Sequence, residues 1–355
     1  MTNVEVTPQM ARWLKSYSES TQERYTTALS HFCKHFETTP EETREWPVEL
    51  AEDRMVDWKN ARVVDYAGAT VRLDFSAVKQ WFLFNRIRVM VQCKNVPATR
   101  KTLDYIPTRE DVQRLLDAAK LHHKIAIGIL AFSGLRPIDV VRMEFQNIKA
   151  SFRKGDEVLT IVKQHKKSKE WYIGFMGTQA TRYVRGYLKA REEQGETITD
   201  TSPVVRWERG PLESQSLRQA IQRIINRSVG NHPTGEPFRR FRPYCLRKYF
   251  RRAVNIIGYA EAEYLMGHRK GLEGLASSYG GLRDLDPQAI DALKKKYISI
   301  LPELETEITD TTLKVQLEKK EKERLKLADE VAEIGKGLEE LKQWAEMMRD
   351  REKEG

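Results

Sequence analysis

Apolar residues recur at helical spacing through most of residues 1–95. One stripe has steps of four, three and four positions and consists of Tyr25, Leu29, Phe32 and Phe36. Such spacing places these side chains on one face of an amphipathic helix, and Thr21 is a candidate N-cap for it. A second helix is predicted within 70–90, where aromatic residues are punctuated by Arg and Lys. The pattern predicts a small helical bundle, whose basic surface either faces a nucleic acid or is only solvated.

The pattern changes at residues 94–110, which hold two prolines, several basic residues and little periodicity. These features predict a linker. Thr108, with acidic residues two and three positions later, predicts the start of a helix because carboxylates favour its positive end. From there to about residue 300 the pattern is helical except at 157–175. That segment has β-branched runs on both sides of a lysine-rich tip, which predicts a β-hairpin.

The residues after Pro302 follow a heptad pattern. Alternating steps of four and three run along a seam of Leu313, Leu317, Lys320, Arg324, Leu327, Val331, Ile334, Leu338, Leu341, Ala345 and Met348. A seam sustained for about five heptads predicts a coiled coil that associates with a second copy. A single long helix packed on its own domain is the alternative. Lys320 and Arg324 are expected to weaken the association or fix its register.

Composition narrows the class of partner. The 355 residues include 61 Lys+Arg and 51 Asp+Glu, so the formal net charge is +10 and the pI is near 9.3. This balance favours nucleic acid or another anionic surface, although net charge alone does not identify the partner.

Several classes of protein are disfavoured. The three cysteines, Cys33, Cys93 and Cys245, contain no CxxC pair and fit neither a disulfide framework nor a cysteine zinc site. Residues 1–20 lack the apolar stretch of a signal peptide, and no window approaches the roughly 20 apolar residues of a membrane span. No His, Asp or Glu cluster has metal-ligand spacing, and no GxxxxGK[ST] loop is present. We therefore expect an intracellular protein with no membrane association, metal or cofactor.

Two segments offer cations for a phosphate. In 129–144, ILAFSGLRPIDVVRME, an apolar helix reaches a Ser-Gly turn, then Arg136, then Asp139 one turn on. Arginine has a planar, permanently charged fork that matches phosphate oxygens, although an arginine after a helix-ending glycine is commonly a cap or a surface residue. The lysines of the hairpin tip are the second source, because a tight turn can hold a lysine against a phosphodiester.

The segment 238–252, FRRFRPYCLRKYFRR, has seven Arg or Lys among fifteen residues. Leu246 and Phe250 mark an apolar face, while Arg247 and Arg251 share another face at helical spacing. A charge run is usually a solvated face, but interleaved aromatics and this density of arginine favour a phosphate-binding surface. The candidate DNA contacts are Arg239, Arg240, Arg242, Lys248 and Arg251.

The segment 265–282, LMGHRKGLEGLASSYGGL, places His268 after a glycine and Tyr279 between small residues eleven positions later. By themselves these residues fit either an ordinary half-buried tyrosine or one site that handles a phosphate.

Taken in order, these segments resemble the tyrosine recombinases, the phage-integrase family of site-specific recombinases, and among them the integrases of archaeal viruses and plasmids. That family carries an Arg in an SGLRxxE/D box, a Lys in a β-hairpin, an HxxR box, a GH pair and a nucleophilic Tyr. The matches are SGLRPID with Arg136 and Asp139, the hairpin with Lys166, YCLR with Arg247, MGHRKG with His268 and SSYGG with Tyr279.

Two positions depart from the family pattern. Tyr244 occupies the first position of the HxxR box, where it can hydrogen-bond a phosphate oxygen but is no cation near neutral pH, since the pKa of tyrosine is about 10. The hairpin is one residue longer than usual. Its Lys-Glu pair at the far end favours Lys166 as the acid, with Lys167 and Lys163 behind it.

The resemblance implies a mechanism. Tyr279 would attack the scissile phosphate to form a covalent phosphotyrosyl intermediate, with Tyr264 or Tyr297 as the next candidates. Arg136 and Arg247 would clamp the phosphate oxygens, and Asp139 would orient Arg136. Lys166 would be the acid for the leaving 5′ oxygen, and His268 would act beside the phosphate.

The resemblance also implies an architecture. We expect a mainly α protein with a small β-sheet, in which a helical core-binding domain (1–95), a linker (96–107), an α+β catalytic domain (108–302) and a C-terminal coiled-coil helix (303–355) follow one another. The implied partner is double-stranded DNA with specific attachment sites, bound by a homo-oligomer that is a tetramer in the synaptic complex. The implied location is the cytoplasm of the host cell, at the nucleoid when the protein is bound to DNA.

Two alternatives remain at the level of sequence. A type IB topoisomerase would share the chemistry but relax DNA through one strand. A non-catalytic architectural DNA-binding protein would explain the basic charge but leave the ordered Arg, Lys, Arg, His and Tyr without a reason.

Overall fold

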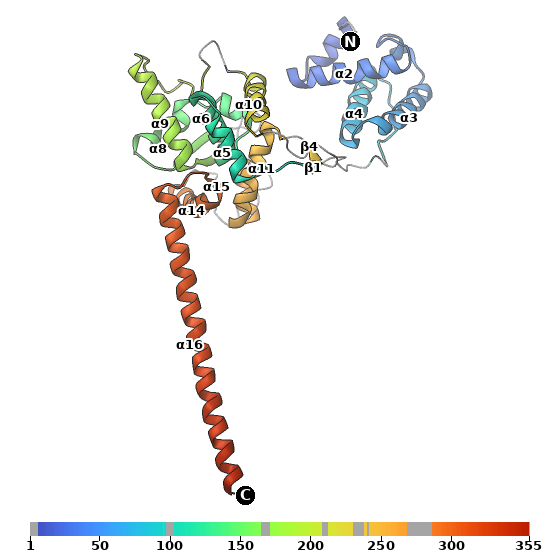
Figure 1. Cartoon of the computed structure of the whole chain (residues 1–355). Helices are drawn as coiled ribbons and strands as arrows, with labels where there is room; N and C mark the ends of the chain where they lie inside the picture. The colour runs from blue at the N-terminus through green and yellow to red at the C-terminus, as the bar shows by residue number, and fades with distance from the viewer. Residues whose placement is uncertain are drawn as a thin grey trace. The chain divides into compact units, whose positions relative to one another are not determined.

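The structure is a computed structural model, which describes residues 6–94, 96, 103–164, 171–207, 212–229, 238–239, 241–267 and 286–354 (Figure 1). The chain divides into two compact units, unit 1 (Met1–Leu103) and unit 2 (Asp104–Gly355). The division falls within the segment that the sequence predicted as a linker.

Unit 1 is a helical bundle around an aromatic core. Its elements are α1 (Pro8–Leu14), α2 (Glu19–His35), η1 (Glu42–Glu45), α3 (Val48–Asp65) and α4 (Gly68–Phe84). The largest buried side chains of its core are Trp13, Phe32, Trp58, Trp81 and Phe82. The predicted helical stripe of α2 lies on this core, with Leu29 and Phe32 fully buried.

Two predicted helix ends in unit 1 were wrong. Thr21 is not the N-cap of α2, because the helix begins at Glu19 and Ser18 holds the capping position without a side-chain cap. The second helix does not continue to residue 90. It ends at Phe84, Arg86 adopts a left-handed backbone (φ 65°), and the chain folds back so that the Ile87 amide donates to Phe82 O. Burying Ile87 and Val89 accounts for the fold-back.

Unit 2 is mainly helical with a small antiparallel sheet of two strands and a second pair of short strands, which confirms the predicted fold class. Its first half holds β1 (Leu103–Asp104), α5 (Arg109–Asp117), α6 (Leu121–Ser133), α7 (Pro137–Val141), η2 (Phe145–Asn147), α8 (Lys149–Arg153), β2 (Leu159–Gln164) and β3 (Trp171–Met176). Its second half holds α9 (Thr178–Glu193), α10 (Ser214–Ser228), β4 (Phe238–Arg239), α11 (Pro243–Val254), η3 (Asn255–Ile257), α12 (Tyr259–Leu265), α14 (Pro287–Ser299), α15 (Leu301–Leu304) and α16 (Asp310–Glu354). β1 pairs with β4, and β2 pairs with β3.

The predicted start of α5 and the predicted hairpin are confirmed. The Thr108 hydroxyl accepts from the Asp111 amide, and the Asp111 carboxylate accepts from the Thr108 amide in a capping box. β2 and β3 pair from Leu159–Met176 to Gln164–Trp171. The lysine-rich tip, 165–170, lies outside the described residues.

α6 is the central helix of unit 2. Every residue from Ile125 to Ser133 is buried, and the helix packs against α9, α11 and β3. A helix that is apolar on all sides has to be covered on all sides. Gly128 helps α9 to approach closely, since a Cβ there would lie 3.3 Å from the Cβ of Ala180.

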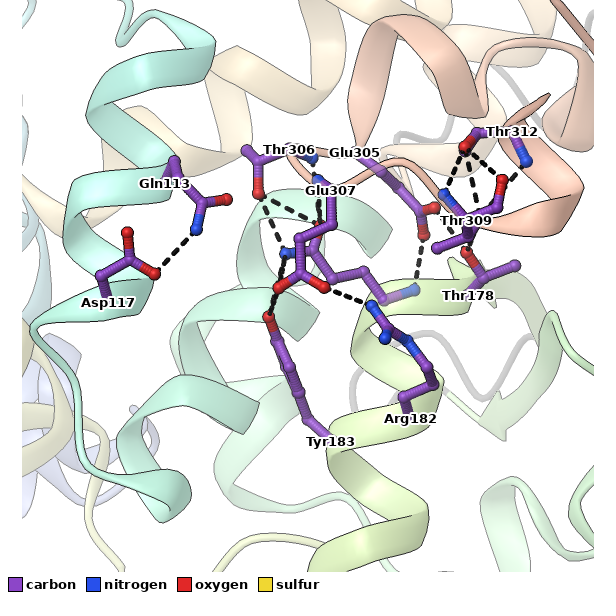
Figure 2. Close-up of polar contacts among 11 residues, drawn as sticks. Gln113, Asp117, Thr178, Arg182, Tyr183, Glu305, Thr306, Glu307, Thr309 and Thr312 are labelled. Atoms are coloured by element: carbon purple, nitrogen blue, oxygen red, sulfur yellow. Dashed lines mark hydrogen bonds and ion pairs between the residues drawn. The ribbon is translucent and has the colours of Figure 1, made fainter.

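A buried polar network holds the segment before α16 against α9 (Figure 2). α9 begins without a side-chain cap of its own, and the carboxylate of Glu305 caps it instead by accepting from the Thr178 hydroxyl and the Gln179 amide. Glu307 accepts from Tyr183 and pairs with Arg182. Leu301, Leu304 and Glu305 are buried in unit 2, and the long helix begins at Asp310.

α16 is one continuous helix of 45 residues (Figure 1). Its predicted seam is exposed over the residues whose side chains are described, including Leu317, Leu327, Val331 and Leu338. The alternative of a helix packed along its own domain is therefore wrong for residues 313–338.

Candidate active site

The SGLRP sequence forms a helix stop, a turn and a helix start. Gly134 ends α6 in the left-handed region (φ 65°), where a Cβ would lie 2.2 Å from the Phe250 ring. Glycine is needed there both for its backbone angle and for its lack of a side chain. Arg136 then takes the N-cap position of α7, Pro137 opens that helix, and the Arg136 side chain is exposed.

Arg247 comes from α11 and bridges the turn at Gly134 to the turn at Met266. Its side chain is buried, with 3% of the residue exposed, and its Nη1 and Nη2 donate to Gly134 O and Met266 O. Burial lowers the pKa of the Arg247 guanidinium, and the charge of Arg136 lowers it further. Arg247 thus joins the SGLR turn to the turn that leads into the GH pair.

Gly267 closes α12 in the left-handed region, with φ 63°, and its amide donates to Tyr264 O at 2.7 Å. This is the usual way in which a glycine ends a helix and redirects the chain. The turn brings Met266 and Gly267 to the rim of a pocket beside Arg247. The chain therefore leaves the described part of unit 2 at the pocket, immediately before His268.

The described residues that line this pocket come from four places in the sequence: Leu135, Arg136, Asp139, Lys163, Tyr172, Arg247, Met266 and Gly267. The pocket contains three cationic side chains and one carboxylate. Lys163 Nζ donates to the main-chain oxygen of Asp139 at 2.8 Å, and burial lowers the pKa of the Lys163 ammonium, which the Asp139 carboxylate opposes. Such an excess of positive charge favours an anion in the pocket.

Several predicted site residues lie outside the described residues: Lys166, Lys167, Arg240, His268 and Tyr279. Of Arg239, only the backbone in β4 is described. Tyr244 is half exposed at the start of α11 and lines a neighbouring groove.

The alternative nucleophiles Tyr264 and Tyr297 are both buried in the core of unit 2, with 1% and 0% exposed. The Tyr297 hydroxyl donates to Phe132 O at 2.5 Å. Burial raises the pKa of Tyr264 to about 12 and raises that of Tyr297 well above its ordinary value. Neither hydroxyl reaches a DNA backbone in this fold.

The other predicted DNA contacts form ion pairs within unit 2. Asp104 in β1 pairs with Arg242 and with Lys248, and Glu263 in α12 pairs with Arg251. Arg242 and Arg251 remain substantially exposed, at 42% and 37% of the side chain. The carboxylates of Asp104 and Glu263 are buried, at 6% and 7% exposed, so these cations neutralise buried charges as well as facing solvent.

A groove beside Tyr244 was missed by the sequence reasoning. Its lining is polar and comes mostly from one face of α10: Gln215, Arg218, Gln219, Gln222, Arg242, Pro243 and Tyr244. The apolar face of α10 is buried through Leu217 and Ile221. Amphipathic spacing in 214–228 could have predicted which face is exposed, but not that it lies next to the start of α11.

Among the described residues, no group of three or more His, Cys, Asp or Glu side chains is placed to hold a metal ion. None of the helices in the described ranges has both the length and the apolarity required to cross a bilayer.

Comparisons with known proteins agree with this geometry. Residues 107–272 match the model of the phage integrase family. A lambda integrase dimer bound to a COC′ core site has a similar fold, with 16% identity, a TM-score of 0.53, and coverage of 76% of this chain and 93% of that chain. The Tn1549 transposon integrase in complex with a circular intermediate DNA has 15% identity, a TM-score of 0.52, and coverage of 75% and 92%.

The XerH site-specific recombinase bound to a palindromic difH substrate is similar at 12% identity and a TM-score of 0.51, with coverage of 79% of this chain and 90% of that chain. No curated protein sequence matches this chain significantly. The matched family model covers the SGLR box, the hairpin, the YCLR box and the GH pair. Residues 107–272 are therefore a domain of the phage integrase family, the tyrosine recombinases.

Proposed function

We propose that this protein is a site-specific DNA recombinase that cleaves and rejoins DNA strands through a covalent 3′-phosphotyrosyl intermediate, and that it integrates or excises mobile or viral DNA. The observation that carries the proposal is the pocket in which Arg136, Lys163 and Arg247 meet. These residues lie far apart in the sequence, and with Gly267 they bring four of the family's motifs to the pocket.

In the proposed reaction, the Tyr279 oxygen attacks the scissile phosphorus, the bond from phosphorus to the 5′ oxygen breaks, and a 3′-phosphotyrosyl bond forms. The hairpin lysine, Lys166, gives a proton to the leaving 5′ oxygen. A 5′ hydroxyl from a second strand then attacks the phosphotyrosyl bond and releases the tyrosine. Because the covalent bond conserves the energy of the phosphodiester, rejoining requires no ATP.

We propose that Arg136 contacts the nonbridging oxygens directly, since it lies exposed at the pocket. Arg247 would add its buried charge from the pocket floor while it holds the two turns in place. His268 follows Gly267 at the rim and would hydrogen-bond the phosphate or assist Tyr279. Asp139 would orient the arginine turn.

We propose double-stranded DNA with specific attachment sites as the partner, and a homo-oligomer as the active form. The similar lambda integrase and XerH structures are DNA complexes, and a lambda integrase tetramer has been solved on a Holliday junction. In this chain the half-exposed Arg242 and Arg251 and the polar groove of α10 supply the chemistry for contacts with phosphates and base edges. The exposed seam of α16 would join the subunits, and the cytoplasm with its nucleoid is the corresponding location.

The test is a suicide DNA substrate with a nick near the cleavage position, which traps protein on DNA in a denaturing gel. The substrate is drawn from the junctions of the mobile or viral DNA that the proposed reaction would integrate. Wild-type protein should form the covalent complex, and Tyr279→Phe should abolish it while binding to the site stays within about twofold.

Tyr259→Phe is the matched control, because Tyr259 is 67% exposed at the start of α12 and lies outside the pocket lining. It should retain covalent complex formation. A Tyr279→Phe protein that still becomes attached to DNA would refute the assignment of the nucleophile. A wild-type protein that binds junction DNA without any attachment would support the architectural alternative.

A further inference from the structure

The β2–β3 hairpin contacts two helices at the pocket, α7 and the end of α12. Lys163 on β2 and Tyr172 on β3 are directly opposite each other in the strand register. Opposed residues project from the same face of a strand pair, and both side chains line the pocket.

Each of the two side chains donates to the main chain of a different helix at the pocket. Lys163 Nζ donates to Asp139 O at 2.8 Å in α7, the helix at whose N-cap Arg136 stands. The Tyr172 hydroxyl donates to Leu265 O at 2.7 Å, in the last residue of α12 before the GH pair. Arg247 joins the turns next to these two helices through Gly134 O and Met266 O.

We propose that Lys163 and Tyr172 form a positioning pair that fixes the β2–β3 hairpin against α7 and the end of α12 at the active site. Their loss would displace Arg136, whose proposed contact with the phosphate is needed whatever the leaving group. The proposal rests on the proposed function and adds two positioning residues to it. A misplacement of about 1 Å between reacting groups is enough to lower a rate on the order of a hundredfold.

A rival role for Lys163 is that of the acid itself. Burial lowers the pKa of its ammonium, as an acid would require, whereas burial raises the pKa of Tyr172 and keeps its hydroxyl a donor. The geometry favours positioning, because Lys163 Nζ is directed to the main-chain oxygen of Asp139. The charged groups around it come from α7 and its two ends, the start of η2 and α11: Arg136, Asp139, Arg142, Glu144 and Arg247.

The experiment measures single-turnover cleavage of two suicide substrates by the full-length protein. One substrate has the natural phosphodiester, and the other has a bridging 5′-phosphorothiolate whose leaving group needs no proton. Lys163→Met and Tyr172→Phe should each slow cleavage of both substrates by the same factor, about tenfold or more, with DNA binding unchanged. Lys163→Arg, which keeps a donor of similar length, should recover most of the rate.

Asn147→Ala is the matched control, because Asn147 Nδ2 donates to Val162 O at 3.0 Å on the same strand but lies outside the pocket lining. It should cleave within about twofold of wild type. The double variant Lys163→Met/Tyr172→Phe should lose less than the product of the single losses, since both act on one alignment. Thermal unfolding of each variant verifies that it folds.

Three results would overturn the positioning role. Selective rescue of Lys163→Met by the phosphorothiolate would make Lys163 the acid. Wild-type rates in both single variants would show that the contacts are dispensable. An equal loss of cleavage rate in Asn147→Ala would show that the contacts of Lys163 and Tyr172 only stabilise the strand pair. Wild-type protein is present in every assay, and its failure to attach to DNA would count against the proposed function and not against this pair.

Discussion

The chemistry of single residues in the site depends on where their backbones turn. Arg247 is the clearest case, because one buried guanidinium reaches two carbonyls that the left-handed glycines at 134 and 267 present to it. The sequence identified Arg247 as a phosphate ligand from its motif. The bridge to Gly134 and Met266 could not be predicted, because it depends on how α6, α11 and α12 pack together.

Arg247→Lys tests this bridge. Lysine keeps the charge but has no planar fork, so one of the two buried carbonyls should lose its donor. We expect the free energy of unfolding to fall by about 1–3 kcal/mol and the rate of covalent complex formation to fall at least tenfold. Denaturant unfolding and the suicide-substrate assay measure the two effects.

Arg251→Lys is the matched control for that variant. Arg251 lies one turn further along α11 and pairs with Glu263, and 37% of its side chain is exposed. It should change the free energy of unfolding by less than about 0.5 kcal/mol. Equal losses in the two variants would mean that Arg247 contributes no more than any arginine of this helix.

Among the helices of unit 2, the start of α5 depends on neighbouring side chains, whereas the start of α9 depends on a distant one. The start of α5 was predicted because Thr108 and Asp111 are neighbours in the sequence. The start of α9 was not, because its cap is Glu305, more than a hundred residues away (Figure 2). Periodicity located α4 but not its end, which depends on the burial of Ile87 in unit 1.

Glu305→Gln tests the cap of α9 through its pH dependence. Burial raises the pKa of the Glu305 carboxyl, which its hydrogen bonds from Thr178 and Gln179 oppose. The folded state therefore holds this proton at higher pH than the unfolded state, whose carboxyl titrates near its ordinary value of 4.5. Wild-type stability relative to Glu305→Gln should fall as pH rises from about 4.5 toward neutrality.

Chemical unfolding of both proteins at several pH values between 4 and 7 measures the difference. Glu303→Gln is the control, since Glu303 is exposed. Its difference from wild type in the free energy of unfolding should hardly change with pH. If the stability of wild type relative to Glu305→Gln rose with pH, the pKa of Glu305 would not be raised in the folded state.

At the scale of the whole molecule, the open question is what covers the seam of α16. A deletion that starts at the predicted boundary, residue 303, would not test this, because it would also remove Leu304 and Glu305 from the core of unit 2. The part of the chain that projects as an exposed helix begins after Thr312, which is itself buried. Oligomerisation has to be tested beyond that residue.

Leu327→Asp and Leu325→Asp form a matched pair for that test. Both leucines are exposed in the single chain, at 61% and 54%, but only Leu327 belongs to the predicted heptad seam. A charge buried in a coiled-coil interface is destabilising. We expect Leu327→Asp to weaken self-association at least tenfold in analytical ultracentrifugation and Leu325→Asp to leave it nearly unchanged. Equal behaviour of the two variants would contradict the coiled coil.

Periodicity, local caps and ordered motifs predicted the helical class, the hairpin, the long C-terminal helix and the family of the matched domain, because each of these signals lies in neighbouring residues. Three sets of contacts became known only from the fold: Arg247 bridges two turns, Lys163 and Tyr172 hold the hairpin to α7 and α12, and Asp104 and Glu263 pair with the predicted DNA-contacting cations. These contacts join segments distant in sequence, and their energy depends on burial and close packing that no local pattern records.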